Sequence, residues 1–93
     1  MKAVRWDTGK NIRLISERGV SFEDVLSAMM HGGLLDTIEH PRGEKYPNQR
    51  MFIVRIREYV YLVPFVENDI EVFLKTIIPS RKATRIYMTN KAN

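Results

Sequence analysis

Apolar residues at helical spacing mark the strongest element of the chain. From Phe22 to Met30 the apolar side chains recur at i, i+3, i+4, i+7 and i+8, so a helix over these residues has one apolar face. Ser21 followed three positions later by Asp24 is a capping-box pattern, which predicts that the helix begins directly after Ser21. The glycines Gly32 and Gly33 end the pattern.

A short strand and a first helix precede this element. Residues 2–6 alternate well enough for a strand, and Asp7 then offers a carboxylate to the free amides of a helix that begins at Thr8. Gly19 is placed to end that helix in the left-handed conformation. The first part of the chain is therefore expected to run strand, helix, helix.

Apolar residues at a period of two, or in short unbroken runs, dominate the rest of the chain. They predict strands over 34–39, 50–57, 59–66 and 70–78, with an interruption, a bulge or a position partly at a sheet edge where Pro64 cannot donate to a ladder. The stretch HPRGEKYPNQ, residues 40–49, holds two prolines and a glycine and is expected to be a loop. Ser80 can cap a final helix that begins at Arg81, whose Ala83, Ile86 and Tyr87 would pack back on the sheet.

This order of elements predicts an α+β fold, with a mostly antiparallel twisted sheet, two N-terminal helices packed on one face and a short C-terminal helix. The 93 residues, 44% of them hydrophobic, suffice for a single domain over 1–93. The chain has no cysteine, no signal-peptide pattern and no apolar run near the ~20 residues that a membrane span needs, so we expect a cytoplasmic protein without membrane contact.

The residues offer little for a metal or an organic cofactor. The two histidines, His31 and His40, lie nine positions apart on different expected elements. The sequence also lacks a glycine-rich phosphate loop and a serine nucleophile elbow. We therefore expect neither a metal nor a cofactor.

Positive charge is concentrated in two acid-poor blocks. The formal net charge is +4, and the isoelectric point is about 9.6. One block, residues 40–57, has Glu44 as its one acid, and the other runs from Ser80 to the end without any acid. This distribution favours an anionic partner such as nucleic acid. The cations are Arg42, Lys45, Arg50, Arg55 and Arg57 in the first block, and Arg81, Lys82, Arg85 and Lys91 in the second.

Cations interleaved with aromatic residues suit single-stranded RNA, because guanidinium groups hold phosphates and rings stack on unpaired bases. Cleavage by the ribose 2′-oxygen would need only a proton acceptor, a proton donor and positive charge on the phosphorane. The candidate catalytic residues are Arg81, Arg50 and Arg55 for charge, and His40 or Glu44, with Tyr61 as a further choice, for the proton. The candidate RNA-binding residues are Arg57, Lys82, Arg85, Tyr61 and Lys10, and the candidate stacking rings are Trp6, Tyr46, Tyr59 and Tyr61.

Several of these residues also have a purely structural interpretation. Arg55 and Arg57 alternate with apolar residues and can form the solvated face of a strand. Trp6 fits a small core better than a stacking platform, and His31 suits the negative end of a helix dipole. Cations at the start of a helix oppose that dipole, so Arg81 and its neighbours are harder to explain without a function.

Two stretches resemble the BrnT family of bacterial toxins, small ribonucleases related in fold to the RelE toxins. The stretch WDTGKNIRLISERGVSFEDV is similar to that family's pattern Trp-Asp-x-x-Lys-Asn followed by Gly-Val-Ser-Phe-Glu. The stretch IIPSRKA is similar to its strand-to-helix signature Ile-Ile-Ser-Ala-Arg-x-Ala, with Pro79 and Ser80 in place of Ser-Ala. The matching residues are Trp6, Asp7, Lys10, Asn11, Gly19, Val20, Ser21, Phe22 and Glu23 in the first stretch, Ile77, Ile78, Arg81 and Ala83 in the second, and Gly43, Glu44 and Arg50 between them.

The resemblance implies a RelE-like fold and a type II toxin that cuts RNA to arrest growth. It also implies a cognate ribbon-helix-helix antitoxin, through which alone the pair would bind operator DNA. The residues by themselves leave two other hypotheses open. The chain can be a module that binds nucleic acid without cutting it, or its basic face can serve to bind an acidic partner segment. In each case the hypothesis requires that Arg50 and Arg81 converge on one surface.

Overall fold

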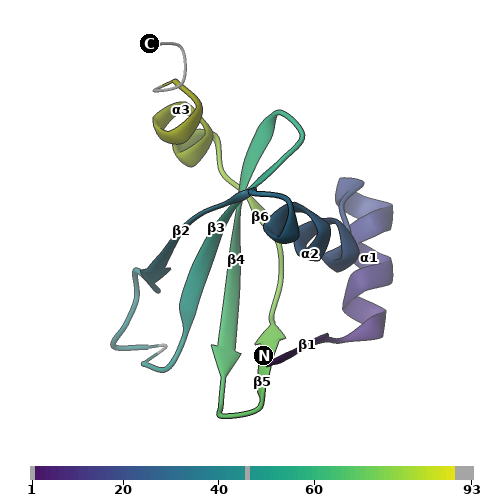
Figure 1. Ribbon diagram of the computed structural model, residues 1–93, viewed down its shortest axis with the longest axis vertical. Helices are drawn as coiled ribbons and strands as arrows, with labels where there is room; N and C mark the ends of the chain where they lie inside the picture. The colour runs from purple at the N-terminus through teal and green to yellow at the C-terminus, as the bar shows by residue number, and fades with distance from the viewer. Residues whose placement is uncertain (1, 46, 90–93) are drawn as a thin grey trace.

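The structure is a computed structural model that describes residues 2–45 and 47–89 (Figure 1). Its elements follow the expected order and lie close to the expected bounds. The α+β prediction is therefore confirmed. The elements are β1 (Ala3–Trp6), α1 (Thr8–Arg18), α2 (Phe22–Met30), β2 (Leu34–Glu39), β3 (Arg50–Ile56), β4 (Tyr59–Glu67), β5 (Glu71–Leu74), β6 (Ile78–Pro79) and α3 (Arg81–Thr89).

The strands form one mixed sheet in the order β1-β5-β4-β3-β2, with β6 also paired to β4. The β2–β3, β3–β4, β4–β5 and β4–β6 pairs are antiparallel, and β1 pairs with β5 in parallel. A bulge interrupts the register of β2 between Leu34 and Asp36. The sheet is therefore mostly antiparallel, as the sequence predicts.

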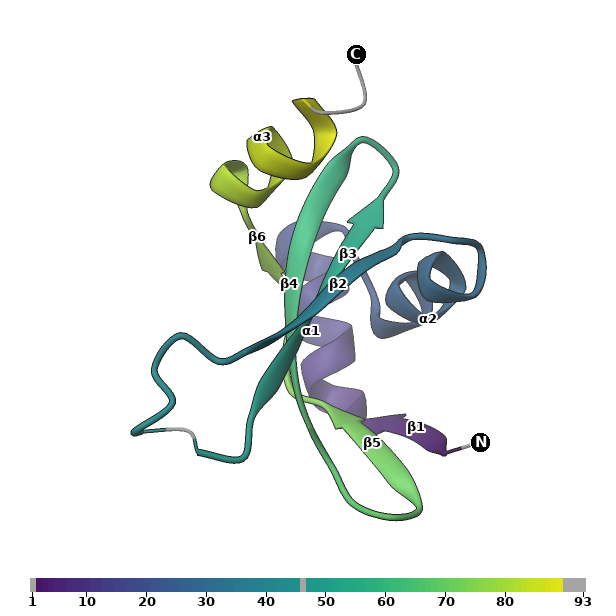
Figure 2. The ribbon, with the colours of Figure 1, turned by 60° about the vertical axis from the view of Figure 1, so that its left-hand side comes forward.

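The two faces of the sheet are covered by different helices (Figures 1 and 2). Val54 and Val63, on one face, pack with Phe22 and Val25 of α2 in the larger core cluster. Ile53 and Val60, which point the other way because strand side chains alternate, pack with α3 in a second cluster. The sheet thus forms the middle layer, with α1 and α2 on one side and α3 on the other.

The strand expected over 70–78 is instead two short strands, β5 and β6. Phe65 pairs with Leu74, whereas Leu62 pairs with Ile78, so three residues lie opposite two of β4 and form an irregularity. Pro64 lies at this point and has no N–H to offer the neighbouring strand. The sequence located the disturbance at Pro64 but did not show that β4 would stay continuous while its neighbour breaks.

The residues that carry the N-terminal resemblance hold α1 and α2 together. Buried Asn11 accepts a hydrogen bond from the Phe22 amide at 2.7 Å and donates one to Glu23 at 2.7 Å. Asp7 caps α1, and Ser21 forms the expected capping box with Asp24. That pattern therefore encodes the junction between two helices, and its residues serve the fold.

Trp6 also belongs to the fold. Its ring stacks on Phe22 with centroids 5.6 Å apart, and it packs against the larger core cluster. The interpretation of Trp6 as a core residue is confirmed.

Candidate nucleic-acid interface

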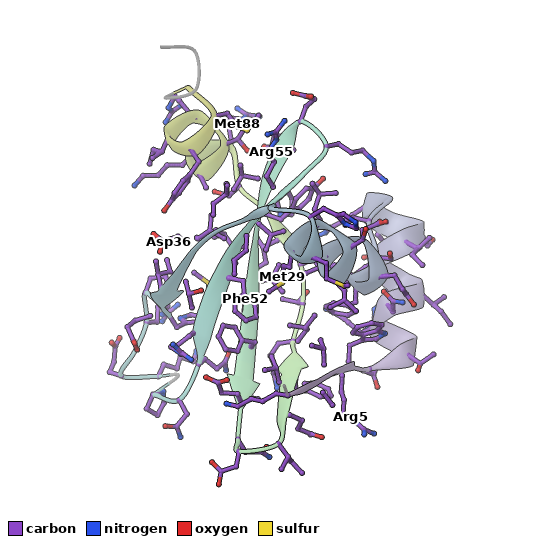
Figure 3. The ribbon with its side chains drawn as sticks, in the orientation of Figure 1. Arg5, Met29, Asp36, Phe52, Arg55 and Met88 are labelled. Carbon is purple, nitrogen blue, oxygen red and sulfur yellow. The ribbon has the colours of Figure 1, made fainter. Side chains whose placement is uncertain are left out.

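An open cleft of about 510 Å³ lies where the end of α2, the β3–β4 hairpin and the end of α3 meet. It contains the polar side chains of Arg55, Arg57, His31 and Tyr87. Figure 3 shows Arg55 and Met88 near one another beside that hairpin. The cleft is lined by Asp24, Ser27, Ala28, His31, Gly32, Gly33, Leu35, Arg55, Ile56, Arg57, Tyr87 and Met88.

Gly33 fixes how α2 meets β3 at this cleft. Its carbonyl oxygen accepts a hydrogen bond from the Arg55 amide at 2.8 Å, and its own amide donates to the Ala28 carbonyl. A Cβ at position 33 would lie 2.7 Å from the carbonyl oxygens of Ala28 and Arg55, which is too close for any other residue without movement. The glycine therefore lets the end of α2, with His31, approach the strand that carries Arg55.

The two arginines are held loosely enough to accept a phosphate. The Arg55 Nε donates to the Arg57 carbonyl at 3.1 Å, and its guanidinium lies 4.0 Å from Glu58. Arg57 lies 3.9 Å from Asp24 with 66% of its side chain exposed. Ion pairs of this length at an exposed surface contribute little, about 0–1 kcal/mol, so an anion can displace the carboxylates.

Arg57 also has an unusual backbone. Its φ of +57° is left-handed, a conformation that a non-glycine residue adopts at an energetic disadvantage. It occupies the turn between β3 and β4, where the hairpin needs such a residue. The turn therefore presents the Arg57 side chain at the rim of the cleft.

His31 and Tyr87 bring titratable groups to the cleft from opposite sides of the sheet. His31 caps the C-terminal end of α2, and its Nδ1 donates to the Ser27 carbonyl at 2.7 Å. The Tyr87 hydroxyl donates to Asp36 at 3.0 Å. Desolvation, and then this bond to Asp36, raise the pKa of Tyr87 above its usual value. The phenol therefore keeps its proton and ties α3 to β2.

The start of α3 is held by the residues of the second resembling stretch. Ser80 accepts a hydrogen bond from the Ala83 amide at 3.0 Å, as a helix cap does, and its own amide donates to the Val60 carbonyl. Thr84 accepts a bond from the Val60 amide at 2.9 Å. Ser80 and Thr84 therefore fix α3 on β4, and the expected cap at Ser80 is confirmed.

The exposed cations of α3 divide between its two sides. Arg81, Arg85 and Met88 lie at i, i+4 and i+7 and share one face, and Met88 lines the cleft. Lys82 instead borders a second hollow of about 260 Å³, lined mainly by apolar residues such as Ile38 and Ile86. Arg81 and Arg85 therefore extend the positive character of the cleft along α3, whereas Lys82 faces elsewhere.

The expected convergence of Arg50 and Arg81 is wrong. Arg50 pairs with Phe65 across β3 and β4, whereas Ser80 bonds to Val60, five residues along β4, which separates their backbones by about 16 Å. Arg50 also forms an ion pair with Glu67 and lies over the Phe65 ring, on the α1–α2 face. The pairing of β3 and β4 therefore places Arg50 and Arg81 at opposite ends and on opposite faces of the sheet. The distribution of charge along the sequence does not reveal this.

Other candidates lie away from the cleft as well. His40 and Glu44 belong to the loop between β2 and β3, which contributes none of its described residues to the lining of the cleft. Pro41 of this loop instead lines the apolar hollow beside α3. Lys10 lies in α1, and among the described residues no residue of α1 lines the cleft. Tyr61 is half-buried against the larger core cluster, with its ring edge against Tyr59 at 5.6 Å. Tyr46 lies outside the described residues.

Sequence reasoning missed two residues of the cleft, His31 and Tyr87. His31 was assigned to the end of a helix, which is correct, and Tyr87 to the face that packs on the sheet, which is also correct. Each residue has its structural role and also lines the cleft, because the ends of α2 and α3 border the cleft. Gly33 was the available signal, because Gly32 alone can end the helix with a left-handed φ and a second glycine permits a close approach of backbones.

No protein-family model, curated protein or solved structure significantly matches this chain. Within residues 2–45 and 47–89, no three His, Asp or Glu side chains gather in a way that would hold a metal ion. In the same part of the chain, no helix has the length and apolar character to cross a membrane.

Proposed function

We propose that this chain is a metal-independent endoribonuclease of the BrnT toxin type, and that the cleft beside the β3–β4 hairpin is where it binds and cuts RNA. The observation that carries the proposal is the gathering of Arg55, Arg57, His31 and Tyr87 in one open cleft. Arg81 and Arg85 continue its positive character along α3. The hypotheses drawn from the sequence required Arg50 and Arg81 to converge. Because the two do not converge, the proposal depends instead on the cations at this cleft.

The geometry supplies the charge that RNA cleavage requires. Attack by the ribose 2′-oxygen on the neighbouring phosphorus concentrates negative charge on the phosphorane oxygens. Guanidinium groups bind such oxygens through paired hydrogen bonds; Arg55 lies near the end of β3, Arg57 lies in the turn that follows, and both line the cleft. The carboxylates of Glu58 and Asp24, which face these arginines now, would give way to the phosphate.

The proposed biological role is that of a cytoplasmic type II toxin neutralised by a ribbon-helix-helix antitoxin, with operator DNA bound only through the antitoxin. Its support is the resemblance in two stretches of sequence together with the α+β fold. The stretch around Asn11 supports the fold, and the stretch around Arg81 adds cations beside the cleft. The role of Arg50, His40 and Glu44 in catalysis stays a prediction.

A cleavage assay on purified protein tests the activity. The chain should cut a single-stranded RNA in the presence of EDTA, and Arg55→Gln with Arg57→Gln should slow cutting by about a hundredfold or more. Arg13→Gln removes an exposed cation of α1 and should cut like the wild type. Intact RNA after incubation with folded wild-type protein would contradict the proposal, as would a double variant that cuts normally.

A module that only binds nucleic acid is the second candidate. The observation that favours it is the exposure of Arg57, whose long ion pair with Asp24 leaves its guanidinium accessible to a phosphate. In that case the same cations would hold phosphates without any cleavage. The logarithm of the affinity would then fall linearly with the logarithm of salt concentration, by about 0.7 for each phosphate bound in a single strand. Salt-sensitive binding with uncut RNA would select this function over the nuclease.

A further inference from the structure

We propose that His31 is the general base of the cleavage reaction. This inference rests on the proposed function and assigns a proton acceptor to the same cleft. Among the described residues, His31 is the histidine that lines the cleft with Arg55 and Arg57. Gly33 holds it there, because the end of α2 is tied to β3 by the bond between the Gly33 carbonyl and the Arg55 amide at 2.8 Å.

The hydrogen bond of the ring determines which nitrogen can accept a proton. A backbone carbonyl can only accept, so the 2.7 Å contact with the Ser27 oxygen requires that the His31 Nδ1 carries hydrogen. In the neutral imidazole Nε2 then holds the lone pair. The fold therefore presents His31 in the tautomer that a base acting through Nε2 needs.

His40 has the opposite arrangement. Its Nδ1 accepts a hydrogen bond from the Arg42 amide at 3.0 Å, so the hydrogen of its neutral ring is on Nε2. His40 is also half-buried and does not line the cleft; its neighbour Pro41 lines the apolar hollow beside Lys82 and Ala83 instead. The two histidines thus differ both in tautomer and in position, and only His31 combines an acceptor nitrogen with the cleft.

The proposed cleavage needs no reactant other than the RNA and water. His31 Nε2 takes the proton of the ribose 2′-hydroxyl while the bond from O2′ to phosphorus forms. The bond from phosphorus to O5′ breaks, and the departing 5′-oxygen takes a proton from water. The products are a 2′,3′-cyclic phosphate and a 5′-hydroxyl end, and His31 then releases its proton to solvent. Arg55 and Arg57 stabilise the charge on the phosphorane oxygens.

Other groups in the cleft set the conditions under which His31 works. The charged or titratable groups that face it are Asp24 of its own helix, Arg55 and Arg57 of β3 and the following turn, and Tyr87 of α3. The Tyr87 hydroxyl donates a hydrogen bond to Asp36, and the Asp24 carboxylate accepts one from the Ser21 amide at 2.9 Å and lies beside Arg57. His31 is then the group in the cleft with a nitrogen open to accept a proton.

The experiment uses the full chain and a short single-stranded RNA, with kcat and KM measured separately. His31→Gln should lower kcat by about a hundredfold to ten-thousandfold, the range for a lost general base, with KM changed by less than about threefold. His31→Ala should regain activity when imidazole is added to the buffer. RNA with a 2′-deoxy sugar at the cleavage position should stay uncut, and the wild-type product should carry a cyclic phosphate.

The outcomes separate the inference from the proposed function. If His31→Gln cuts at the wild-type rate while the Arg55 and Arg57 variants are slow, the inference fails and the ribonuclease function stands. Loss of kcat in His40→Gln with normal kcat in His31→Gln would move the base to the other histidine and overturn the inference. If the wild type itself does not cut RNA, the function fails and the inference fails with it. His31 is exposed at a helix end, so its variants should fold, which circular dichroism will verify.

Discussion

The amide of Arg55 and the carbonyl oxygen of Gly33 are joined by a 2.8 Å hydrogen bond that closes the gap between α2 and β3. This bond needs the two backbones to come close, and Gly33 is the residue that permits it. Both His31 and Arg55 take their positions in the cleft from this contact. The contact therefore links the packing of one small residue to the geometry of the proposed site.

Substitution of Gly33 by alanine should damage both stability and the cleft. The new Cβ would meet two backbone oxygens at 2.7 Å, and neither oxygen belongs to a side chain that can turn away. We expect a loss of about 1–3 kcal/mol in the free energy of unfolding, measured with urea. Gly32→Ala is the matched control. It has open space around its Cβ but a φ of +87°, and should cost only about 1 kcal/mol. Equal effects at the two positions would contradict the close approach.

The cations of α3 provide a second prediction. Arg81→Gln combined with Arg85→Gln should weaken RNA binding and reduce the salt slope by about 1.4, or about 0.7 for each lost phosphate contact. Lys82→Gln should have a smaller effect, because Lys82 faces the apolar hollow instead of the cleft. Arg81 opposes the helix dipole, so its removal should leave the protein at least as stable. Fluorescence anisotropy at several salt concentrations measures the binding, and a larger effect at Lys82 would refute this assignment of faces.

Asn11→Ala should destabilise the junction of α1 and α2. The buried amide of Phe22 would lose its acceptor, which typically costs about 1–3 kcal/mol. Two hydrogen bonds to the Glu23 carboxylate lower the pKa of Glu23: the larger effect comes from the Asn11 side chain and the next from the Glu23 backbone amide. A lowered carboxylate pKa stabilises the folded state above the unfolded pKa, and this contribution is lost as pH falls through the folded pKa.

The difference in the free energy of unfolding between wild type and Asn11→Ala should therefore become smaller in acid. It should not vanish, because the hydrogen bond from the Phe22 amide to Asn11 does not titrate. Urea unfolding at pH 7 and at pH 3 provides the comparison. Glu23→Gln keeps an acceptor for Asn11 and removes the titrating carboxylate. A gap between wild type and Asn11→Ala that widens in acid would contradict this explanation.

Tyr87→Phe should loosen α3 from β2. The hydrogen bond to Asp36 would be lost, at a cost of about 0.5–1.5 kcal/mol at neutral pH. The folded-state pKa of Tyr87 is raised, so its stabilising effect is complete below the unfolded value of about 10 and is lost as pH rises further. The difference between Tyr87→Phe and wild type should thus shrink above pH 10. Hydrogen exchange of the α3 amides measures the loosening, and unchanged exchange would show that the bond does not hold the helix.

The sequence predicted the elements well where a local rule decides them. Asp7, Gly19 and Ser21 set helix ends through their own side chains or backbone freedom, and each acts as expected. The strand expected over 70–78 divides into β5 and β6 opposite Pro64 of β4. Which of the two paired strands would break there depends on their pairing, which no local pattern in the sequence contains. Local chemistry is readable in the chain, whereas register is not.

The candidate site was harder to predict for the same reason. Arg55, Arg57, Arg81 and Arg85 were identified from their charge, but their distribution over the molecule depends on strand order and on the face that each helix covers. Arg50 was grouped with them because it lies near Arg55 in sequence, yet the seven residues of β3 carry the two to opposite ends of a strand. His31 escaped notice because a helix-end role already explained it.

The parallel pairing of β1 with β5 has a consequence for how the protein assembles. Ala3 lies beside Glu71, so β1 has no partner in the sheet until β5 has been synthesised. The α1–α2 unit contains its own short-range bonds and can take shape early, whereas β1 waits for a contact of high sequence separation. Closure of that edge is therefore expected among the last events of folding, and a nascent chain halted before β5 would leave its N-terminal strand exposed to other partners.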